Sequence, residues 1–348
     1  MPEDSVGLLR RIARARLAGR MLRRLRRAGV RDARYHSKRF EIRFTVPGED
    51  EPTIVPLALL PARRRAVDDL VTELLRVPPG WDEAAPRLRP VLRGAAPGDP
   101  IRRPVLPFLS EFAVIDQPDT MTYVTEAQVT AWKRPIDEIF TTARNNLTGA
   151  VLHGMASGPT IVRFVDDGNS YWTSHLLLPG WLARLADQVG GPPVAFAPER
   201  GTLLVTADDP ELLAALFAEA ETIFVTAPHP LTPMAYRSDA DGCTIPYRAP
   251  TGHPLHQTVR RAERLLAMHE YHQQPPDPSL PSAELHLLGS TTEGWRTRAV
   301  WSENSPTLLP EADEVQAGPR TIPWPDLAPH LTPTTHSPSR WLATSWPR

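Results

Sequence analysis

The apolar residues of this chain recur with a helical period near its beginning and a strand period further on. A helix is predicted over residues 5–28, because a rotation of about 100° per residue gathers apolar side chains on one stripe, with most arginines opposite. The stripe holds Leu8, Ile12, Ala15, Leu22 and Leu25, whereas Leu9, Leu17 and Met21 fall outside it. Residues 34–46 and 53–60 alternate like strands around the turn "PGEDEP", and a second helix is predicted over 62–77.

The middle of the chain repeats one unit, two short strands followed by a helix. Within residues 159–224, "TIVRFV" and "SYWTSHLL" are predicted to pair across "DDGN" before a helix over 179–189. "PVAFA" and "TLLVTA" pair across "PERG" before a helix capped by Asp209. Strands joined by tight turns are antiparallel. The predicted class is therefore α+β, with antiparallel sheets built from hairpins that alternate with helices in ββα-type units.

Upstream of this repeat, "EFAVID" and "MTYV" flank a turn, Thr125 is a predicted helix cap, and Pro135 begins the next helix. Downstream, a hairpin over 234–248 and a helix over 254–273 precede a predicted β-meander of "AELHLLG", "GWRTRAVW" and "TLLPEADEVQ". The Pro-rich tail carries three tryptophans, which favours its packing on the body of the protein. Four segments result: an N-terminal basic helix, hairpin and helix (1–80), a Pro-rich connection (81–104), a central α+β domain (105–250), and a C-terminal helix, meander and tail (251–348).

Composition bounds the class of protein. Hydrophobic residues at 41% and charged residues at 23% are ordinary for a soluble protein. The sequence has no run of about 18 apolar residues, which predicts no membrane span, and its Arg-rich start lacks the apolar core of a secretory signal. The single cysteine, Cys243, excludes an internal disulfide and a cysteine-based zinc cluster. These features predict a cytoplasmic protein.

Basic residues are concentrated before Phe44, although the net charge of the chain is only −1. A basic arm is typical of nucleic-acid or membrane-surface binding. Only two of the 39 basic residues are lysines, however, a bias that a GC-rich bacterial genome also explains. The sequence leaves both interpretations open. The residues proposed for nucleic acid are Arg16, Arg20, Arg23, Arg24 and Arg27.

Two segments between residues 35 and 225 stand out, "PVLPFLSEFAVIDQPDTMTYVTEAQVTAWKRPIDEIFTTARNNL" and "PVAFAPERGTLLVTADDPELLAALF". With weaker matches around them, they resemble the YtpQ-like bacterial proteins, a family defined by a domain of unknown function, and the first segment is the most specific. The recurring family elements are Asp116, the "YVT" at 123–125, Trp132, the Asn-Leu pair at 146–147, and the "P-x-R" of Pro198 and Arg200. The family has no established activity, so the resemblance implies a domain and not a reaction.

Three residues are candidate ligand contacts: Asn146, Arg200 and Asp116. Asn146 lies at the flank of a helix whose buried face ends at Leu147, where an Asn most often bonds free carbonyl groups. Arg200 lies in a hairpin turn, where it is either an ordinary surface residue or an anion ligand with a fixed fork of donors. Asp116 ends a strand and favours a turn-forming role over that of a catalytic acid.

Motifs with known chemistry are scarce. His269 and His272 lie one helical turn apart, but their spacing is not H-E-x-x-H. "GMASG" lacks the G-x-S-x-G spacing, and the sequence has neither a P-loop nor G-x-G-x-x-G. No catalytic residue, metal ligand or cofactor is therefore assigned. The favoured function is a non-catalytic binding or accessory protein with a protein or small-ligand partner; the alternatives are nucleic-acid binding through the Arg-rich helix and an unrecognised enzyme.

Overall fold

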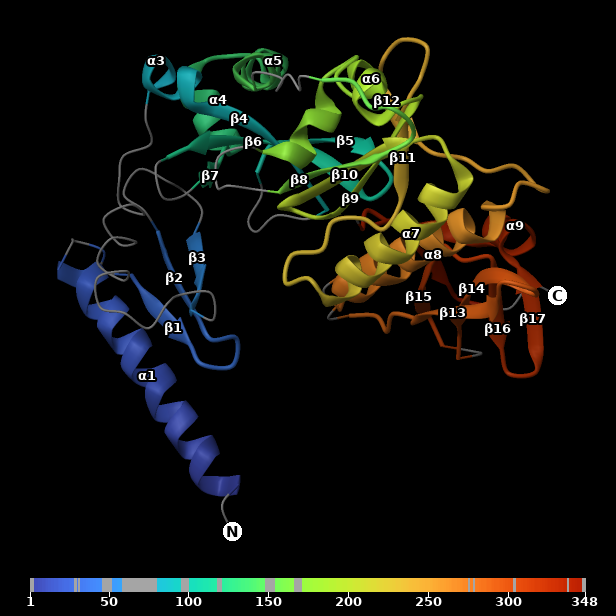
Figure 1. Cartoon of the computed structure of the whole chain (residues 1–348). Helices are drawn as coiled ribbons and strands as arrows, with labels where there is room; N and C mark the ends of the chain where they lie inside the picture. Colours follow the sequence, from blue (N-terminus) through green and yellow to red (C-terminus); the bar gives the residue numbers. More distant parts are fainter. Residues whose placement is uncertain are drawn as a thin grey trace. The chain divides into compact units, whose positions relative to one another are not determined.

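Helices and antiparallel sheets make up this α+β protein, seen in a computed structural model (Figure 1). It describes residues 3–27, 30, 32–45, 52–57, 80–94, 100–117, 121–147, 154–165, 171–274, 276–277, 279–302, 305–336 and 338–345. The chain forms two compact units. The first comprises residues 1–86, 96–100 and 124–136, and the second comprises 87–95, 101–123 and 137–348. The four predicted segments remain a prediction from composition.

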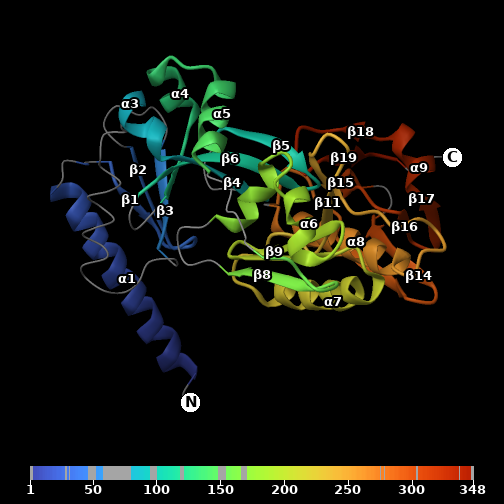
Figure 2. The same ribbon diagram turned by 45° about the horizontal axis from the view of Figure 1, so that its top comes forward.

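The first unit packs helix α1 (Glu3–Arg27) on a three-stranded antiparallel sheet, as Figures 1 and 2 show. The strands are β1 (Arg34–His36), β2 (Glu41–Thr45) and β3 (Pro52–Pro56). In the part of α1 whose side chains are described, Leu17, Ala18, Met21 and Leu25 are buried. The predicted apolar stripe is thus wrong in part: Leu17 and Met21 belong to the core, and Ala15 is exposed. The packing of the sheet selects this face, which an imperfect periodicity did not reveal. The helix predicted over 62–77 lies outside the described residues.

A local sequence signal fixes the start of helix α4 in this unit. Thr125 caps α4 (Glu126–Trp132) in a capping box, in which its hydroxyl accepts from the Gln128 amide and the Gln128 side chain accepts from the Thr125 amide. The indole of Trp132 packs edge-on against Trp81 of the short helix α3 (Trp81–Ala84), with ring centroids 5.6 Å apart. A pair of this kind stabilises by about 1 kcal/mol beyond its buried area.

The second unit begins with a sheet centred on β6 (Leu109–Asp116). Strand β4 (Leu88–Arg93) pairs along one side of β6, and β5 (Arg102–Leu106) and β7 (Met121–Tyr123) pair along the other, all antiparallel. Residues 81–104, predicted as a Pro-rich connection, therefore contain α3 and a core strand. Pro90 is tolerated because β4 pairs on one side only, at the edge of the sheet.

Helix α5 (Ile136–Asn146) begins directly after Pro135 and lies beside this sheet (Figure 1). Ile139, Phe140 and Ala143 are buried, Asn145 is exposed and Asn146 is half-buried, as the helical periodicity predicted.

A five-stranded antiparallel sheet in the order β12-β11-β9-β10-β8 forms the middle of the unit. Its strands are β8 (Ile161–Val165), β9 (Pro193–Glu199), β10 (Thr202–Ala207), β11 (Ala235–Ser238) and β12 (Thr244–Pro246). Helix α7 (Pro210–Thr226), capped by the Asp209 carboxylate, covers one face of this sheet and forms a core with Phe196 and Leu204.

"SYWTSHLL", predicted as a strand, is instead the 3-10 helix η3 (Trp172–Leu177). The strand-like composition of this segment did not decide its structure, because residues 173–177 are buried in the helical conformation. The helix predicted over 179–189 is shorter, made of η4 (Ala183–Leu185) and α6 (Ala186–Val189).

Helix α8 (His256–Gln273) packs on α7 and on the C-terminal strands. The predicted meander is wrong beyond its first two strands. Its third segment divides into β15 (Thr307–Pro310), which joins a separate sheet, and β16 (Glu314–Ala317), which pairs parallel to β14 (Gly294–Val300). The remaining C-terminal elements are β13 (Leu285–Ser290), β17 (Arg320–Pro323), α9 (Trp324–Leu327), η5 (Ala328–His330), β18 (Thr332–Pro333) and β19 (Arg340–Ala343). Trp324 is buried in one hydrophobic core with Tyr271 and Leu285 and lies edge-on to Trp341 at 5.0 Å, so the described part of the tail packs on the body as predicted. The third tryptophan, Trp346, lies outside the described residues.

Candidate functional site

One face of the β4–β6–β7 sheet gathers polar side chains from three strands. Residues that oppose each other in an antiparallel pair share a face, and alternate residues along a strand return to it. Arg89 opposes Val114, which in turn opposes Tyr123. Arg93 lies four residues after Arg89 and Asp116 two after Val114, so all four polar residues belong to this face.

Tyr171, directly before η3, brings its ring to this face. Its hydroxyl donates to Asp116 Oδ1 at 2.6 Å, and its charge environment includes Arg89 and Arg93. The backbone of Tyr171 is left-handed, with φ 47° and ψ 39°, a conformation that costs a non-glycine residue about 1–2 kcal/mol. The Ser174 amide donates to the Tyr171 carbonyl oxygen at 2.9 Å, and the same oxygen lies 3.2 Å from His175 Nδ1. The start of η3 therefore holds Tyr171 in this strained position.

Arg200 reaches the same place from the turn between β9 and β10. Its amide donates to the His229 carbonyl at 3.3 Å, and its own carbonyl accepts from the Thr173 hydroxyl at 3.3 Å. Its side chain is exposed, yet its charge acts on Arg93. We call Arg93, Arg200, Tyr123, Tyr171 and Asp116 the Arg93 cluster.

The Arg93 guanidinium is the unusual member of this cluster. Its side chain is 6% exposed, and Nη1 donates to the Leu92 carbonyl at 2.7 Å, while Nε is buried without a hydrogen-bond partner. Burial first, and the positive charge of Arg200 second, lower the pKa of Arg93 to about 10, so it is still protonated at neutral pH. Among the described residues, neither Arg93 nor Arg200 forms an ion pair with a carboxylate.

Burial and the hydrogen bond to Asp116 both raise the pKa of Tyr171. The hydroxyl therefore remains protonated over the physiological range and keeps donating to Asp116. Asp116 is correspondingly engaged as an acceptor and orients the Tyr171 ring.

Asn146, the third predicted contact, does not join the Arg93 cluster. Its Nδ2 donates to the Leu88 carbonyl at 3.1 Å, at the opposite end of β4 from Arg93. Five residues of strand separate Leu88 from Arg93, a distance of about 16 Å. Asn146 thus ties the end of α5 to the first residue of β4.

The neighbouring Arg144 makes the stronger contact of α5 with the sheet. Its Nε and Nη2 donate to the two carboxylate oxygens of Glu111, both at 2.8 Å, and Arg103 Nε donates to Glu111 Oε2 at 2.5 Å. Glu111 has no exposed side-chain surface. This Arg–Glu–Arg group lies on the face of the sheet opposite the Arg93 cluster, because Glu111 follows Ser110, the cross-strand partner of Arg93.

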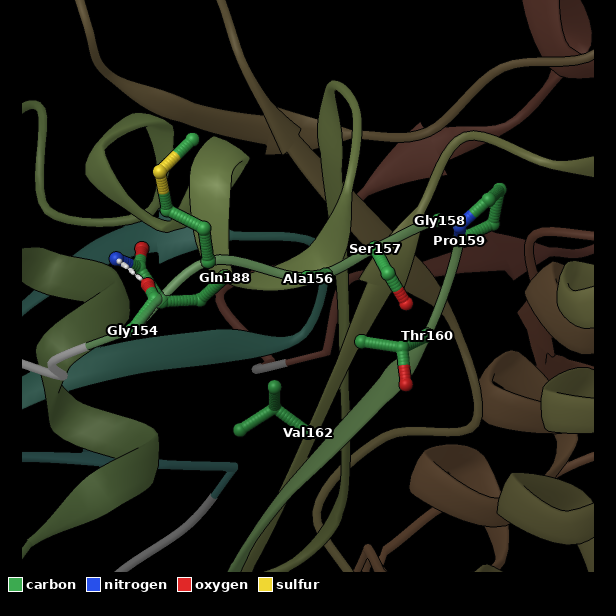
Figure 3. Close-up of a pocket in the computed structure, with 9 residues that line it drawn as sticks. Gly154, Ala156, Ser157, Gly158, Pro159, Thr160, Val162 and Gln188 are labelled. Carbon is green, nitrogen blue, oxygen red and sulfur yellow. Dashed lines mark hydrogen bonds between the residues drawn. The ribbon is translucent and has the colours of Figure 1, made fainter.

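A hollow of about 540 Å³ lies elsewhere in the unit, along residues 154–160 with Val162 and Gln188 (Figure 3). Gln188 Nε2 donates to the Gly154 carbonyl at 3.2 Å, the dashed line in the figure. Ser157 lies on its wall and forms no hydrogen bond with a described residue. The wall is mostly backbone and small side chains, which offers no concentration of charge.

A second hollow, of about 400 Å³, lies at the start of α8 beside Trp295. Its two arginines are paired with carboxylates: Arg260 with Asp313 at 3.6 Å, and Arg296 with Glu314 at 3.1 Å. Their charges are therefore already offset within the protein, unlike that of Arg93.

His269 and His272, the histidine pair noted in the sequence, both lie near the end of α8. His269 packs edge-on against Phe224 at 4.8 Å, and burial, with the charge of His272, lowers its pKa. Within the described ranges, no three histidine, cysteine or acidic side chains come close enough together to hold a metal ion.

No family model, curated protein sequence or solved structure matches this chain, so the resemblance to YtpQ-like proteins stays a prediction. None of the helices in the described part of the chain combines the length and apolar character needed to cross a membrane.

Sequence reasoning identified Asp116 and Arg200 but missed Arg93, Tyr123 and Tyr171. A signal was present in β4: "LRPVLR" places two arginines four residues apart on one face of a strand that is otherwise buried. Nothing in the local sequence indicated that Tyr171, 55 residues after Asp116 in the chain, would reach the same face.

Proposed function

We propose that this protein is a non-catalytic binding protein whose ligand carries a small anionic group, a carboxylate or a phosphate, held between Arg93 and Arg200. One observation carries the proposal. A buried guanidinium with an unpartnered Nε is opposed by the charge of a second guanidinium, that of Arg200, and no described carboxylate pairs with either.

The physical reason is the cost of this arrangement without a ligand. An uncompensated buried charge destabilises the fold by several kcal/mol, and buried cations in proteins are normally paired. Two cations close together add repulsion. An anion between them would accept a hydrogen bond from Arg93 Nε and offset the repulsion, and the guanidinium fork suits the planar oxygens of carboxylates and phosphates.

The remaining members of the Arg93 cluster support binding more than catalysis. The Tyr171 hydroxyl donates to Asp116, so this carboxylate is occupied as an acceptor and Tyr171 is fixed in place. Tyr123 interacts with Arg93. The cluster thus supplies positive charge and hydrogen-bond donors in a fixed arrangement.

Isothermal titration calorimetry of the purified chain tests the proposal, with inorganic phosphate and citrate as separate probes. We expect one or both to bind, and the stronger of the two identifies the anion class. Arg200→Gln should weaken binding by about ten- to a hundredfold, the value of a charge-assisted hydrogen bond of about 1.5–3 kcal/mol. Arg200 is exposed, so this exchange should leave folding intact.

Arg184→Gln provides the matched control, because Arg184 is an exposed arginine of the same unit outside the cluster. It removes the same charge and should leave the affinity unchanged. Absence of binding to both probes, or equal affinities of the two variants, would refute the proposal.

A further inference from the structure

The described part of α1 carries a stripe of arginines on the side away from its core. At about 100° per residue, Arg16, Arg20 and Arg23 fall within about 60° of one another. They lie roughly opposite the buried Met21 and Leu25. Arg16 and Arg23 are exposed and Arg20 is half-exposed. Figures 1 and 2 show the β1–β3 sheet along one side of α1, so the stripe faces away from that sheet.

The arginines of this stripe have no partner in the described part of the chain. Arg16, Arg20 and Arg23 form no ion pair or hydrogen bond there. The nearby acids of the α1–β3 body are used elsewhere: Asp32 Oδ2 accepts from the Thr45 amide at 2.8 Å, and Glu41 pairs with Arg43 at 2.8 Å. Within the described residues, the positive charge of the stripe is therefore uncompensated.

Two further residues proposed from the sequence contribute less to the argument. Arg24 has a contact within the protein, and it lies about 60° or more from Arg16 around the helix. The side chain of Arg27 lies outside the described side chains. We call Arg16, Arg20 and Arg23 the α1 arginine stripe.

The apolar side of α1 bears on whether an anionic membrane surface or a nucleic acid is the better partner for these arginines. A helix that binds a membrane surface inserts its apolar face among the lipids. Here Leu17, Met21 and Leu25 are at most 7% exposed, because they pack on the sheet. This makes a membrane surface a poor partner for residues 14–26, the part of the helix whose side chains are described.

The aromatic residues of the β1–β3 sheet and its turns bear on whether the nucleic acid is single-stranded or double-stranded. Single-stranded nucleic acids are bound through exposed aromatic rings on which bases stack. Phe44 is buried, Tyr35 packs edge-on against Phe40 at 6.4 Å, and Arg14 covers the Phe40 ring at 4.7 Å. These rings are engaged within the protein.

We propose that the α1 arginine stripe binds the phosphate backbone of duplex DNA without reading its sequence. The stripe supplies three cations on successive turns of one helix, and phosphate contacts of this kind give affinity and orientation without specificity. This inference concerns the first unit and is independent of the anion proposed for the Arg93 cluster.

Fluorescence anisotropy of a labelled mixed-sequence duplex of about 25 base pairs, titrated with the full chain, tests the proposal. Three phosphate contacts give a slope of about −2.7 for log affinity against log salt, so raising salt from about 50 to about 200 mM should lower the affinity about fortyfold. The triple variant Arg16→Gln, Arg20→Gln, Arg23→Gln should lose most of the binding and of the salt dependence. Glutamine preserves helix propensity, and circular dichroism checks the fold.

The matched control replaces three exposed arginines of the second unit: Arg184→Gln, Arg237→Gln and Arg248→Gln. It changes net charge equally and should retain the affinity. If the triple α1 variant unfolds, the single exchange Arg16→Glu, at an exposed position, should still weaken binding at least about tenfold. Three results would overturn the proposal: no binding of duplex by the wild-type chain, equal losses in variant and control, or tighter binding to phosphatidylglycerol vesicles than to the duplex.

Discussion

Exchange of Glu111 for glutamine tests whether the buried Arg103–Glu111–Arg144 group anchors α5 to its sheet. The Glu111 side chain has no exposure and accepts three hydrogen bonds from two guanidinium groups. Removing one partner of a buried ion pair costs about 3–5 kcal/mol. Arg103 and Arg144 keep 33% and 28% of their side-chain exposure, so water can partly solvate them again. We therefore expect Glu111→Gln to cost about 3 kcal/mol, the lower end of this range.

Hydrogen exchange followed by mass spectrometry on peptides covering β6 and α5 measures this locally. A loss of about 3 kcal/mol would accelerate exchange in these peptides by about 150-fold where exchange reports the opening equilibrium. Arg144→Gln should cost about 2 kcal/mol, because Glu111 keeps Arg103. The double variant should fall short of the sum by about 1–2 kcal/mol, since both exchanges remove the same contact.

The exposed pair Arg163–Glu219 is the matched control. It is also bidentate, but its side chains are 48% and 34% exposed. Glu219→Gln should cost less than about 1 kcal/mol, as exposed ion pairs do. The reasoning fails if Glu111→Gln costs no more than Glu219→Gln, or if the costs of Glu111→Gln and Arg144→Gln are additive.

Three further predictions concern other parts of the second unit. Burial raises the pKa of Glu270 to about 7, so the unfolded chain releases this proton at lower pH than the folded chain does. The contribution of Glu270 to stability should be complete below about pH 4.5 and fall by up to about 3 kcal/mol as pH rises through about 7. Urea midpoints measured across this pH range should show the loss, and Glu270→Gln should remove this part of the pH dependence. Gly190→Ala should lower the melting temperature more than Gly252→Ala: both glycines have positive φ, but an added Cβ would lie 2.5 Å from the Gly158 carbonyl oxygen in the first case and meet nothing within 4 Å in the second. Arg340→Lys should speed proteolysis of the tail. The buried Arg340 donates to the backbone carbonyls of three separate segments, and a single ammonium group cannot reach all three together. An unchanged rate of cleavage would contradict this.

The elements that the sequence predicted well are those fixed by local physics. The capping box at Thr125 and the Asp209 cap satisfy free amides a few residues away, so their signatures lie within short windows. The strands β9 and β10 pair across a tight turn, so the signal for this pair also lies within a short window of sequence. The α+β class follows from many such short signals and does not depend on any one of them.

The errors arose where distant parts of the chain decide the structure. η3 has the composition of a strand, but its buried residues and its bonds to Tyr171 and Arg200 impose a compact turn of helix. The buried face of α1 was chosen by the sheet that packs on it, which a helix pattern with two competing apolar stripes does not specify. The third strand of the meander divided because β15 and β16 pair with strands in two different sheets.

The candidate site shows the same limit. Asp116 and Arg200 could be selected from residue type and family position, but their convergence on Arg93 depends on Tyr171 and on the turn between β9 and β10. Asn146, chosen on equal grounds, bonds a carbonyl at the far end of β4.

The two faces of the β4–β6 sheet explain why arginines of similar position deserve different interpretations. Arg103 and Arg144 converge on Glu111 on one face, and the carboxylate satisfies both. On the other face, Arg93 is more deeply buried than Arg103 or Arg144, and the charge with the largest effect on it is that of a second arginine, Arg200. The carboxylate of the cluster, Asp116, accepts from Tyr171. A structural role accounts for the first group, because Glu111 accepts from both arginines and a second carboxylate, Asp137, lies 3.9 Å from Arg103. Among the described residues, no carboxylate offsets the charges of the second group, and this asymmetry within a single sheet supports the proposed ligand binding by the Arg93 cluster.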